Sequence, residues 1–400
     1  MKKTIAMILC LTLCLALFAG CGGSGGSTNA NSGSSAANSG STSAGAAATT
    51  ASDGKVYEMT VVNHDSINSM GEKWLETLLN TIAEESGGRL KFNYYAGGSM
   101  YGATETLDAV KDGAADICWY TTGTYGGVFP LSEFVNMPGN GINSAQLGSA
   151  VINTMIKEVP EVAAEYDNWH ILAIHGTSNS PFSTVGKKIE KVDDFKGLTI
   201  RAAGTIPTMY INQLGSTAIA MPTSDVYDSL AKKTISGMCN DWHNIDCFKL
   251  YEPIDYCMDV QMNECASGVL MNKARWDSLP SDLQELFNKY FASYYASDMA
   301  GYWWDSCRYW VGDEMRENNV EIYEPSQEVA DYIFSDAVVG PVRASYVEYL
   351  NGKGYDGEAM TQTFEAIVAR LADQYAHVWD SEFNYADWDQ SQVNGYKAKY

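Results

Sequence analysis

The apolar positions of residues 54–120 change repeatedly between the spacing of strands and the spacing of helices. Short apolar runs predict strands at residues 56–63, 89–95 and 115–120. Apolar residues three and four apart predict helices between them, at residues 69–86 and 104–111. Strands that alternate with helices in this way are typical of an α/β domain.

A second set of strands and helices follows further along the chain. Its elements, in order, are strands at 170–175 and 197–203, a helix at 207–214, a strand at 217–221, a helix at 224–232 and a strand at 237–239. The chain after residue 53 is too long for one ordinary hydrophobic core, so we expect at least two lobes. Ligands of such sheets bind at the carboxyl ends of the strands, where two lobes would face each other.

Residues 281 to about 318 carry apolar side chains at three- and four-residue steps, which predicts one long helix. At 1.5 Å per residue it would span roughly 55 Å, more than the width of one lobe. We therefore expect it to brace both lobes or to be kinked near Gly301. A coiled-coil dimer is the alternative, which we favour less because the apolar stripe drifts and lacks heptads.

The first 53 residues predict an export signal and a tether. A basic start is followed by the apolar run 5–19, and residues 17–21, Leu-Phe-Ala-Gly-Cys, are typical of a lipoprotein cleavage site with Cys21 as the acylated residue. We prefer cleavage after residue 20 to a transmembrane anchor because the run is short and no charged stop follows it. Residues 22–52 have no charge and no large apolar side chain, so residues 21–53 are expected to be a flexible, lipid-anchored tether on the outer face of the cell membrane.

Charge and cysteine usage narrow the function further. The formal net charge is −23, or −25 once Lys2 and Lys3 leave with the signal, which argues against a nucleic-acid partner. No Cys-x-x-Cys pair occurs and the five histidines show no metal-site spacing, so we expect neither a metal site nor a cofactor. Small buried thiols are the preferred interpretation of the six remaining cysteines, although disulfides are permitted outside the cell. These are Cys118, Cys239, Cys247, Cys257, Cys265 and Cys307.

One arginine stands inside an otherwise apolar strand. Arg201 is flanked by Leu, Thr, Ile and two Ala in residues 198–203, which read as buried. An unpaired buried guanidinium is costly, so we expect an anion near it. The guanidinium fork suits two parallel hydrogen bonds to a carboxylate of a ligand, and an ion pair within the lobe is the alternative.

The region around Arg201 resembles the DctP-type solute-binding proteins of tripartite ATP-independent periplasmic (TRAP) transporters. The shared motifs are Lys-Gly-Leu-Thr-Ile-Arg at 196–201, Met-Pro at 221–222, Asp-Val-Tyr-Asp-Ser-Leu at 225–230 and Gly-Met-Cys-Asn at 237–240. They are preceded by Gly-Gly at 97–98 and by residues 105–116, which fit the first-lobe helix of the family and the entry into the strand after it. The resemblance covers roughly residues 55–383 and does not identify a ligand.

The resemblance implies an α/β, two-lobe periplasmic-binding-protein-like (type II) fold with a central ligand cleft and a long helix that braces both lobes. Lobe I is expected at 54–177 plus about 266–306, and lobe II at about 178–265 plus 307–400. The implied function is that of an extracytoplasmic solute receptor, not an enzyme. It would capture a small organic acid anion and deliver it to the small and large TRAP membrane subunits.

The resemblance also carries site residues. Arg201 matches the carboxylate-clamping arginine of the family, and Asn240 matches its binding asparagine, although Ser236 stands where the family has Asp. Glu105 is either a ligand-binding acid or a helix-terminal carboxylate. Residues 179–182 lack the second arginine of many relatives, so a dicarboxylate clamp is not expected.

Aromatic residues near these positions are either pocket wall or core. Trp119 and Tyr120 are both candidates for the ligand opening near Arg201 and Asn240, although a core position is preferred for Trp119, and we expect Trp242 to line the pocket. His64 either donates to a ligand or lies in a solvated loop.

Two other functions compete with the TRAP receptor. A lipoprotein receptor of an ABC importer would also have two lobes, but it would not be expected to carry the motif set around Arg201. An anchored hydrolase has little support, because the one Gly-x-Ser-x-Gly match, at 22–26, lies in the tether where no strand-to-helix turn can form.

Overall fold

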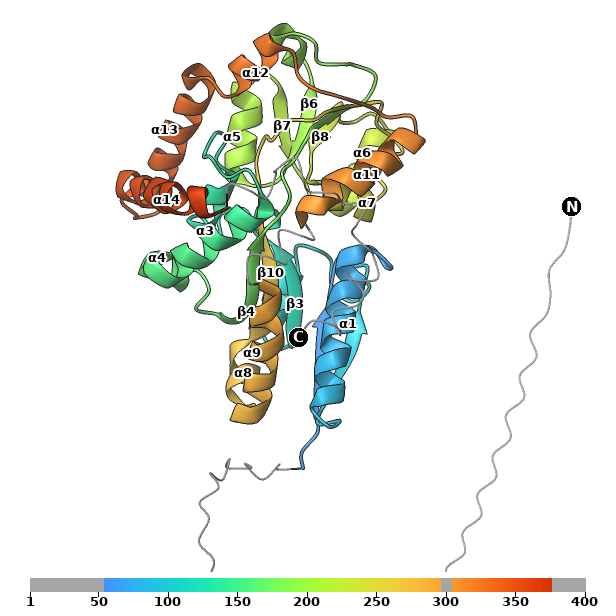
Figure 1. Cartoon of the computed structure of the whole chain (residues 1–400), viewed down its shortest axis with the longest axis vertical. Coiled ribbons are helices and arrows are strands. Elements are labelled where there is room, and N and C mark those ends of the chain that lie inside the picture. Colours follow the sequence, from blue (N-terminus) through green and yellow to red (C-terminus); the bar gives the residue numbers. More distant parts are fainter. Residues whose placement is uncertain (1–53, 296–303, 376–400) are drawn as a thin grey trace, which may run out of the picture. The chain divides into compact units, whose positions relative to one another are not determined.

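The computed structural model describes residues 54–295 and 304–375 (Figure 1), so the predicted signal peptide, Cys21 and the tether lie outside the described residues. The first of its two sheets has the strand order β2-β1-β3-β10-β4. Its strands are β1 (Tyr57–Val62), β2 (Leu90–Tyr95), β3 (Ile117–Thr121), β4 (Trp169–Gly176) and β10 (Ala266–Asn272). β1 is parallel to β2 and β3, whereas β10 runs antiparallel to β3 and β4.

The first βαβαβ unit is present as predicted. Helix α1 (Met70–Glu85) begins where the Ser69 hydroxyl accepts a hydrogen bond from the backbone N–H of Glu72, and α2 (Thr106–Lys111) connects β2 to β3. The inner face of α1 and that of α9 (Ser281–Tyr295) pack on the first sheet through apolar side chains, among them Leu75, Leu78 and Phe287. This sheet and its helices are called the first lobe below.

The second sheet has the order β11-β9-β5-β8-β6-β7. Its strands are β5 (Phe182–Thr184), β6 (Thr199–Ala202), β7 (Thr217–Ala220), β8 (Gly237–Cys239), β9 (Tyr256–Met258) and β11 (Glu321–Tyr323). Helices α5 (Thr205–Gln213), α6 (Val226–Ala231) and α7 (Trp242–Cys247) follow β6, β7 and β8 in turn. Because β6 is parallel to both β7 and β8, the loops after these three strands open at one edge. This sheet and its helices are called the second lobe.

One element of the predicted second set belongs elsewhere. The strand expected at 170–175 is β4, which pairs with β10 in the first sheet. Its grouping with the second set was wrong because strand membership depends on pairing with β10, about a hundred residues later, and local periodicity carries no information about that partner.

The predicted long helix is described as two helices. α9 packs against α1 and β4 of the first lobe, and α11 (Ser306–Glu317) packs against α7 and β11 of the second. Their axes run in different directions in Figure 1, so the described parts are not one straight rod. Residues 296–303 lie outside the described residues, and a continuous brace stays a prediction.

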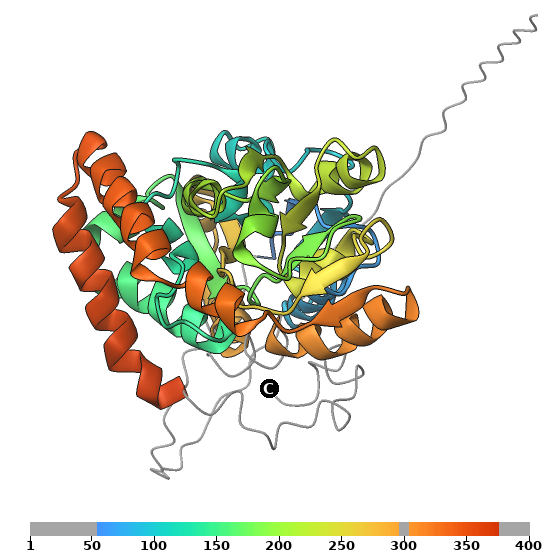
Figure 2. The ribbon, with the colours of Figure 1, turned by 90° about the horizontal axis from the view of Figure 1, so that it is seen from above.

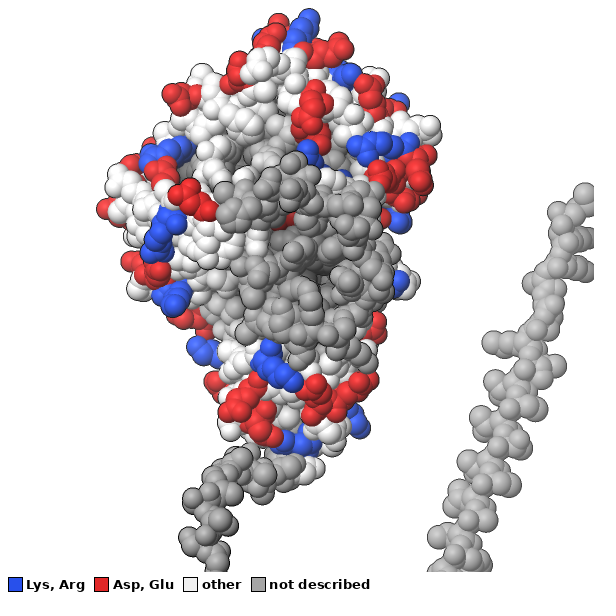
Figure 3. Space-filling model, in the orientation of Figure 1, with Lys and Arg blue, Asp and Glu red and all other residues white. Residues whose placement is uncertain are grey.

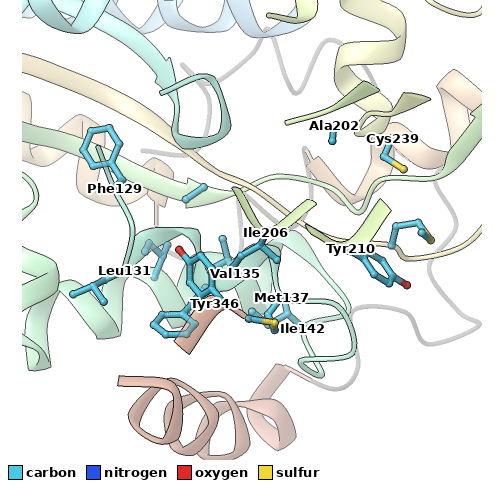
Figure 4. Close-up of a cluster of buried hydrophobic side chains, with 14 of the residues drawn as sticks. Phe129, Leu131, Val135, Met137, Ile142, Ala202, Ile206, Tyr210, Cys239 and Tyr346 are labelled. Carbon is cyan, nitrogen blue, oxygen red and sulfur yellow. The ribbon is translucent and has the colours of Figure 1, made fainter. Parts of the chain in front are cut away.

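Helices from the C-terminal third contact both lobes. α13 (Asp336–Gly352) packs on α5 of the second lobe, and α14 (Gly357–Ala372) packs on α3 (Ala145–Glu158), which covers β4 of the first. Figure 2 shows this pair along one side of the molecule. One hydrophobic cluster runs through these contacts, and Figure 4 shows part of it, including Phe129, Ile206, Tyr210 and Tyr346. The lobe boundaries stay a prediction because residues of both sheets share this core. The remaining helices are α4 (Pro160–Ala164), α8 (Lys273–Asp277) and α12 (Gln327–Ile333).

The six cysteines expected to be buried thiols are all buried. Acidic and basic side chains are interspersed on the face of the molecule shown in Figure 3. Among the helices of residues 54–295 and 304–375, none combines the length and the apolar character needed to cross a bilayer.

Candidate functional site

Arg201 lies on β6, the strand next to the edge strand β7 of the second sheet, and is 3% exposed. β6 places it opposite Ile219 of β7 and Met238 of β8. Its Nε donates to the carbonyl oxygen of Met221 at 3.2 Å, Nη1 to that of Cys239 at 3.3 Å, and Nη2 to the hydroxyl of Thr223 at 3.0 Å. These neutral acceptors hold the guanidinium at the carboxyl edge of the sheet.

The charge of Arg201 has no carboxylate within ion-pair distance in the described ranges, which disfavours an ion pair within the lobe. Burial lowers the pKa of Arg201 to about 10, and the negative field of Asp241 works against this shift. The guanidinium therefore stays protonated at neutral pH. It carries five N–H donors, of which only three have acceptors in the part of the chain that the structure describes.

Asn240 follows Cys239 at the end of β8 and is 2% exposed. Neither Oδ1 nor Nδ2 of its side-chain amide has a hydrogen-bond partner among the described residues. A buried amide without partners costs about 1–3 kcal/mol, so such groups are rare and usually await a ligand or a bound water. Since Arg201 donates to the carbonyl of Cys239, the unpartnered amide lies one residue from an acceptor of the guanidinium.

A cavity of about 410 Å³ opens beside these residues. Its wall from the first lobe is the short loop after β3, and its wall from the second lobe comes from the loops after β6 and β7. The lining residues are Gly123, Thr124, Gly126, Gly204, Thr205, Thr208, Met209, Ala220, Met221 and Pro222. Met221 belongs to this wall and also accepts a hydrogen bond from Arg201, so the guanidinium lies directly behind the lining. The volume and the mostly apolar, small side chains suit a compact organic molecule.

The two lobes approach each other closely at this cavity. A Cβ atom on Gly123 would lie 3.0 Å from the carbonyl oxygen of Ala203. Gly204, with a φ of 102°, turns the chain sharply from β6 into α5, and a Cβ there would lie 2.9 Å from the carboxylate of Glu133. These glycines permit the contact between the loop after β3 and the loop after β6.

The aromatic candidates lie away from this cavity. Tyr120 is fully buried, and its ring packs against Phe129 and Tyr166 in the core, so the structure does not place it at the opening. Trp119 is also buried, with its ring 6.3 Å from that of Trp304 and nearly parallel to it. This position matches the preferred core interpretation of Trp119. The direction of the Tyr120 side chain is set by the pleat of β3, and the neighbouring residues in the sequence do not indicate it.

Trp242, Glu105 and His64 also lie outside the cavity lining. Trp242 is 3% exposed and borders a separate cavity of about 320 Å³ together with Arg308 and Asp259. Glu105 is exposed at the N-terminus of α2, where its carboxylate accepts a hydrogen bond from the backbone N–H of Gly102 at 2.9 Å, which fits the helix-terminal interpretation.

His64 is partly buried rather than solvated. Desolvation lowers its pKa, against the opposing effect of Asp65, and its Nδ1 has no partner among the described residues.

A buried cluster formed by Asp65, His243 and Cys247 was not predicted from the sequence. His243 Nε2 lies 3.4 Å from Asp65 Oδ2, across 178 residues of sequence, and the backbone N–H of Ser66 donates to Cys247 Sγ at 3.3 Å. Burial by itself would lower the pKa of His243, but its hydrogen bond to Asp65 holds it well above the usual range. His243 and Cys247 are four residues apart on α7, a spacing that places two potential metal ligands on one face of a helix. This spacing could have indicated the cluster, but the sequence was considered only for Cys-x-x-Cys pairs and for the spacing of its histidines.

The sequence pattern of one protein family, described as bacterial extracellular solute-binding protein, family 7 (DctP), matches residues 62–334. This chain belongs to the DctP family. The resemblance drawn from the motifs around Arg201 is therefore confirmed, and the alternative of an ABC-importer receptor loses its support.

Curated relatives of this DctP protein are distant. A monocarboxylate 2-oxoacid-binding periplasmic protein of Nostoc sp. is 25% identical over 235 residues, which are 53% of this chain and 59% of that protein. The chain spans about three fifths of the length of the first curated relatives that it matches.

Solved TRAP solute-binding proteins share the fold. One from a marine metagenome, specific for aromatic acid ligands and crystallised with 3-hydroxybenzoate, superposes with a TM-score of 0.73 at 22% identity, covering 79% of this chain and 99% of that chain. Another, from Rhodoferax ferrireducens with copurified benzoate, has a TM-score of 0.72 at 24% identity and coverages of 80% and 100%. The two-lobe α/β fold predicted from the sequence is thus confirmed.

Proposed function

We propose that this DctP family member is the solute receptor of a TRAP-type transporter and that it binds an organic carboxylate at Arg201 and Asn240. The observation that carries the proposal is a buried charge and a buried amide near the same end of the second sheet, neither of which has its full set of polar partners in residues 54–295 and 304–375. The guanidinium of Arg201 has no carboxylate there and donates to the carbonyl oxygen of Cys239, the residue before Asn240, whose side-chain amide has no hydrogen-bond partner there. A carboxylate ligand would supply what both of them lack.

The ligand's carboxylate would accept hydrogen bonds from the free N–H groups of Arg201 and from Asn240 Nδ2, while Asn240 Oδ1 accepts from a hydroxyl or a water on the ligand. The body of the ligand would occupy the cavity, against Met209, Met221 and Pro222. Binding between two lobes excludes water, and a charge-assisted hydrogen bond is stronger in the dry site. No bond is made or broken in this scheme, in keeping with a binding protein.

The names of the relatives support an organic acid as the ligand. The two solved neighbours hold 3-hydroxybenzoate and benzoate, and a third, from Bordetella bronchiseptica, holds mandelate. Each ligand has one carboxylate and an apolar ring, a combination that fits a single arginine behind a small apolar cavity.

The partners follow from the same proposal. The proposed membrane partners are the small and large TRAP permease subunits, which work with receptors of this family. Cys21 is proposed to carry a lipid that holds the receptor to the outer face of the cell membrane, with residues 21–53 as the tether.

Calorimetric titration of the purified protein tests the site. Benzoate and benzamide are similar in size and differ in charge. We expect the protein to bind benzoate and not benzamide. Arg201→Lys keeps the charge but loses the guanidinium fork, so we expect its affinity for the acid to fall about 10- to 100-fold.

The matched control is Arg308→Lys, which alters an arginine paired with Asp259 at the other cavity and should leave the affinity unchanged. Equal binding of benzoate and benzamide, or an Arg201→Lys protein that binds as the wild type does, would refute the carboxylate clamp. The panel should extend to 3-hydroxybenzoate, mandelate and a 2-oxoacid, so that a preference for another acid is not read as a lack of binding.

A further inference from the structure

The cluster of Asp65, His243 and Cys247 joins the two lobes at a buried position. Asp65 lies in the loop that connects β1 to α1 in the first lobe, whereas His243 and Cys247 project from α7 in the second. One potential ligand atom from each side chain lies within 4.8 Å of the other two. The side chains of His243 and Asp65 are 2% and 3% exposed, and Cys247 is 4% exposed.

The backbone of α1 packs closely against the cluster. α1 contacts α7 here, and the residue of α1 that faces the cluster is Gly71. A Cβ atom at position 71 would lie 2.9 Å from Asp65 Oδ2 and 3.1 Å from His243 Nε2. Any larger residue would therefore push into the space that the carboxylate and the imidazole share.

We propose that Asp65, His243 and Cys247 form a binding site for a divalent transition-metal ion of the zinc type that links the two lobes. A thiolate, an imidazole nitrogen and a carboxylate oxygen make a borderline-soft ligand set that suits Zn²⁺ better than Ca²⁺ or Mg²⁺. The fourth position would be taken by water. This inference goes beyond the carboxylate receptor proposed above and does not depend on it.

The geometry is close to what the ion requires. Ligand atoms around a tetrahedral zinc ion are about 3.4–3.6 Å apart. The Asp65–His243 pair, at 3.4 Å, already meets this value, and the largest separation in the cluster, within 4.8 Å, needs side-chain movements on the order of 1 Å. His243 and Cys247 lie one helical turn apart on the same face of α7, as in other helical metal sites.

Binding is balanced in charge. The ion displaces the thiol proton of Cys247 and the proton that His243 shares with Asp65, and both protons leave to solvent. A dication that replaces two protons leaves the net charge of the buried cluster unchanged, so no uncompensated charge is created between the lobes.

A metal ion at this position would favour the arrangement in which the lobes are together. Two ligands come from one lobe and one from the other, so the complete site exists only when α1 and α7 are in contact. The ion and a ligand held between the lobes would each raise the affinity of the other, because both bind that arrangement more tightly.

Cobalt spectroscopy of the chelator-treated protein tests the site directly. Co²⁺ should bind one equivalent and give the near-ultraviolet thiolate charge-transfer band, and Zn²⁺ should displace it. Cys247→Ser should abolish the band, while Asp65→Asn and His243→Gln should weaken metal binding at least about 100-fold. Gly71→Ala keeps all three ligands but fills the space between them and should also weaken binding.

Two matched variants serve as controls. Cys257→Ser changes another buried free thiol, in β9, and His170→Gln changes a histidine outside the cluster; both should keep the band and the affinity. The absence of a stoichiometric band in the wild type, its survival in Cys247→Ser, or its equal loss in Cys257→Ser would overturn the proposal. Benzoate affinity measured in chelator tests the receptor function separately, so either proposal can fail without the other.

Discussion

Replacing Asn240 by leucine should stabilise the ligand-free protein and weaken ligand binding. The substitution keeps the approximate size of the side chain and removes two buried polar atoms that have no partner among the described residues. Burying an unpartnered amide costs about 1–3 kcal/mol, so the free energy of unfolding should rise by about that amount in the absence of ligand. A gain in stability from loss of a binding group is typical of functional sites.

The same change should lower carboxylate affinity by about 10- to 100-fold, because a hydrogen bond to a charged ligand contributes about 1.5–3 kcal/mol. Urea unfolding followed by tryptophan fluorescence measures the first quantity, and calorimetric titration of the ligand measures the second. The two effects have opposite signs, which separates a binding role from general damage to the fold.

Asn63→Leu is the matched control. Asn63 is 1% exposed, and both atoms of its amide are used, since Nδ2 donates to the hydroxyl of Tyr94 and Oδ1 accepts from the backbone N–H of Asp65, each at 2.9 Å. Its replacement should destabilise the protein by about 1–3 kcal/mol. If Asn240→Leu destabilises the ligand-free protein as much as Asn63→Leu does, the amide of Asn240 has partners without ligand and the reasoning is wrong.

Three further predictions concern packing and protonation. Gly123→Val should weaken ligand binding by holding the loops after β3 and β6 apart, whereas Gly126→Ala, whose Cβ meets nothing within 4 Å, should bind normally in the same titration. Gly268→Ala places a Cβ 2.1 Å from the carbonyl oxygen of Ala173, between β10 and β4, and should lower the urea midpoint by the equivalent of more than about 2 kcal/mol; a wild-type midpoint would contradict the strand register. Burial raises the pKa of Glu165 from 4.5 to about 7, so the folded protein holds this proton more tightly than the unfolded chain does. The resulting stabilisation is fully present below pH 4.5, and about 3 kcal/mol of it is lost as the pH rises through about 7. Glu165→Gln should therefore flatten the pH dependence of the urea midpoint between pH 4.5 and about 7, and an unchanged slope would exclude Glu165 as its source.

The helices and strands could be predicted from the sequence because the periodicity of apolar residues that defines them is local. The first βαβαβ unit lies within a residue or two of its predicted bounds, since side chains of neighbouring residues decide which face of a strand or helix is apolar. Arg201 was also readable, because a charge in an apolar strand is conspicuous whatever the strand packs against. Its burial without a carboxylate partner in the described ranges follows that expectation.

Other features depend on contacts between residues far apart in the chain and could not be predicted from the sequence. The pairing of β4 with β10 and the joining of the lobes by α13 and α14 each depend on a partner about a hundred residues or more away, and the core position of Tyr120 depends on packing against Phe129 and Tyr166, which lie outside β3. The cluster of Asp65 with His243 and Cys247 is the extreme case, since two lobes must fold and meet before it exists.

The sequence by itself thus determined the family, the α/β class and the presence of an arginine in an apolar strand, because each is encoded by residues close together in the chain. Tertiary structure alone decided which groups remain without partners and which cavity they border. The physical reason is that hydrogen-bond satisfaction is a property of all the atoms around a group: both Asn240 and Arg201 are buried away from water, and residues 54–295 and 304–375 supply no partner to the amide and no carboxylate to the guanidinium.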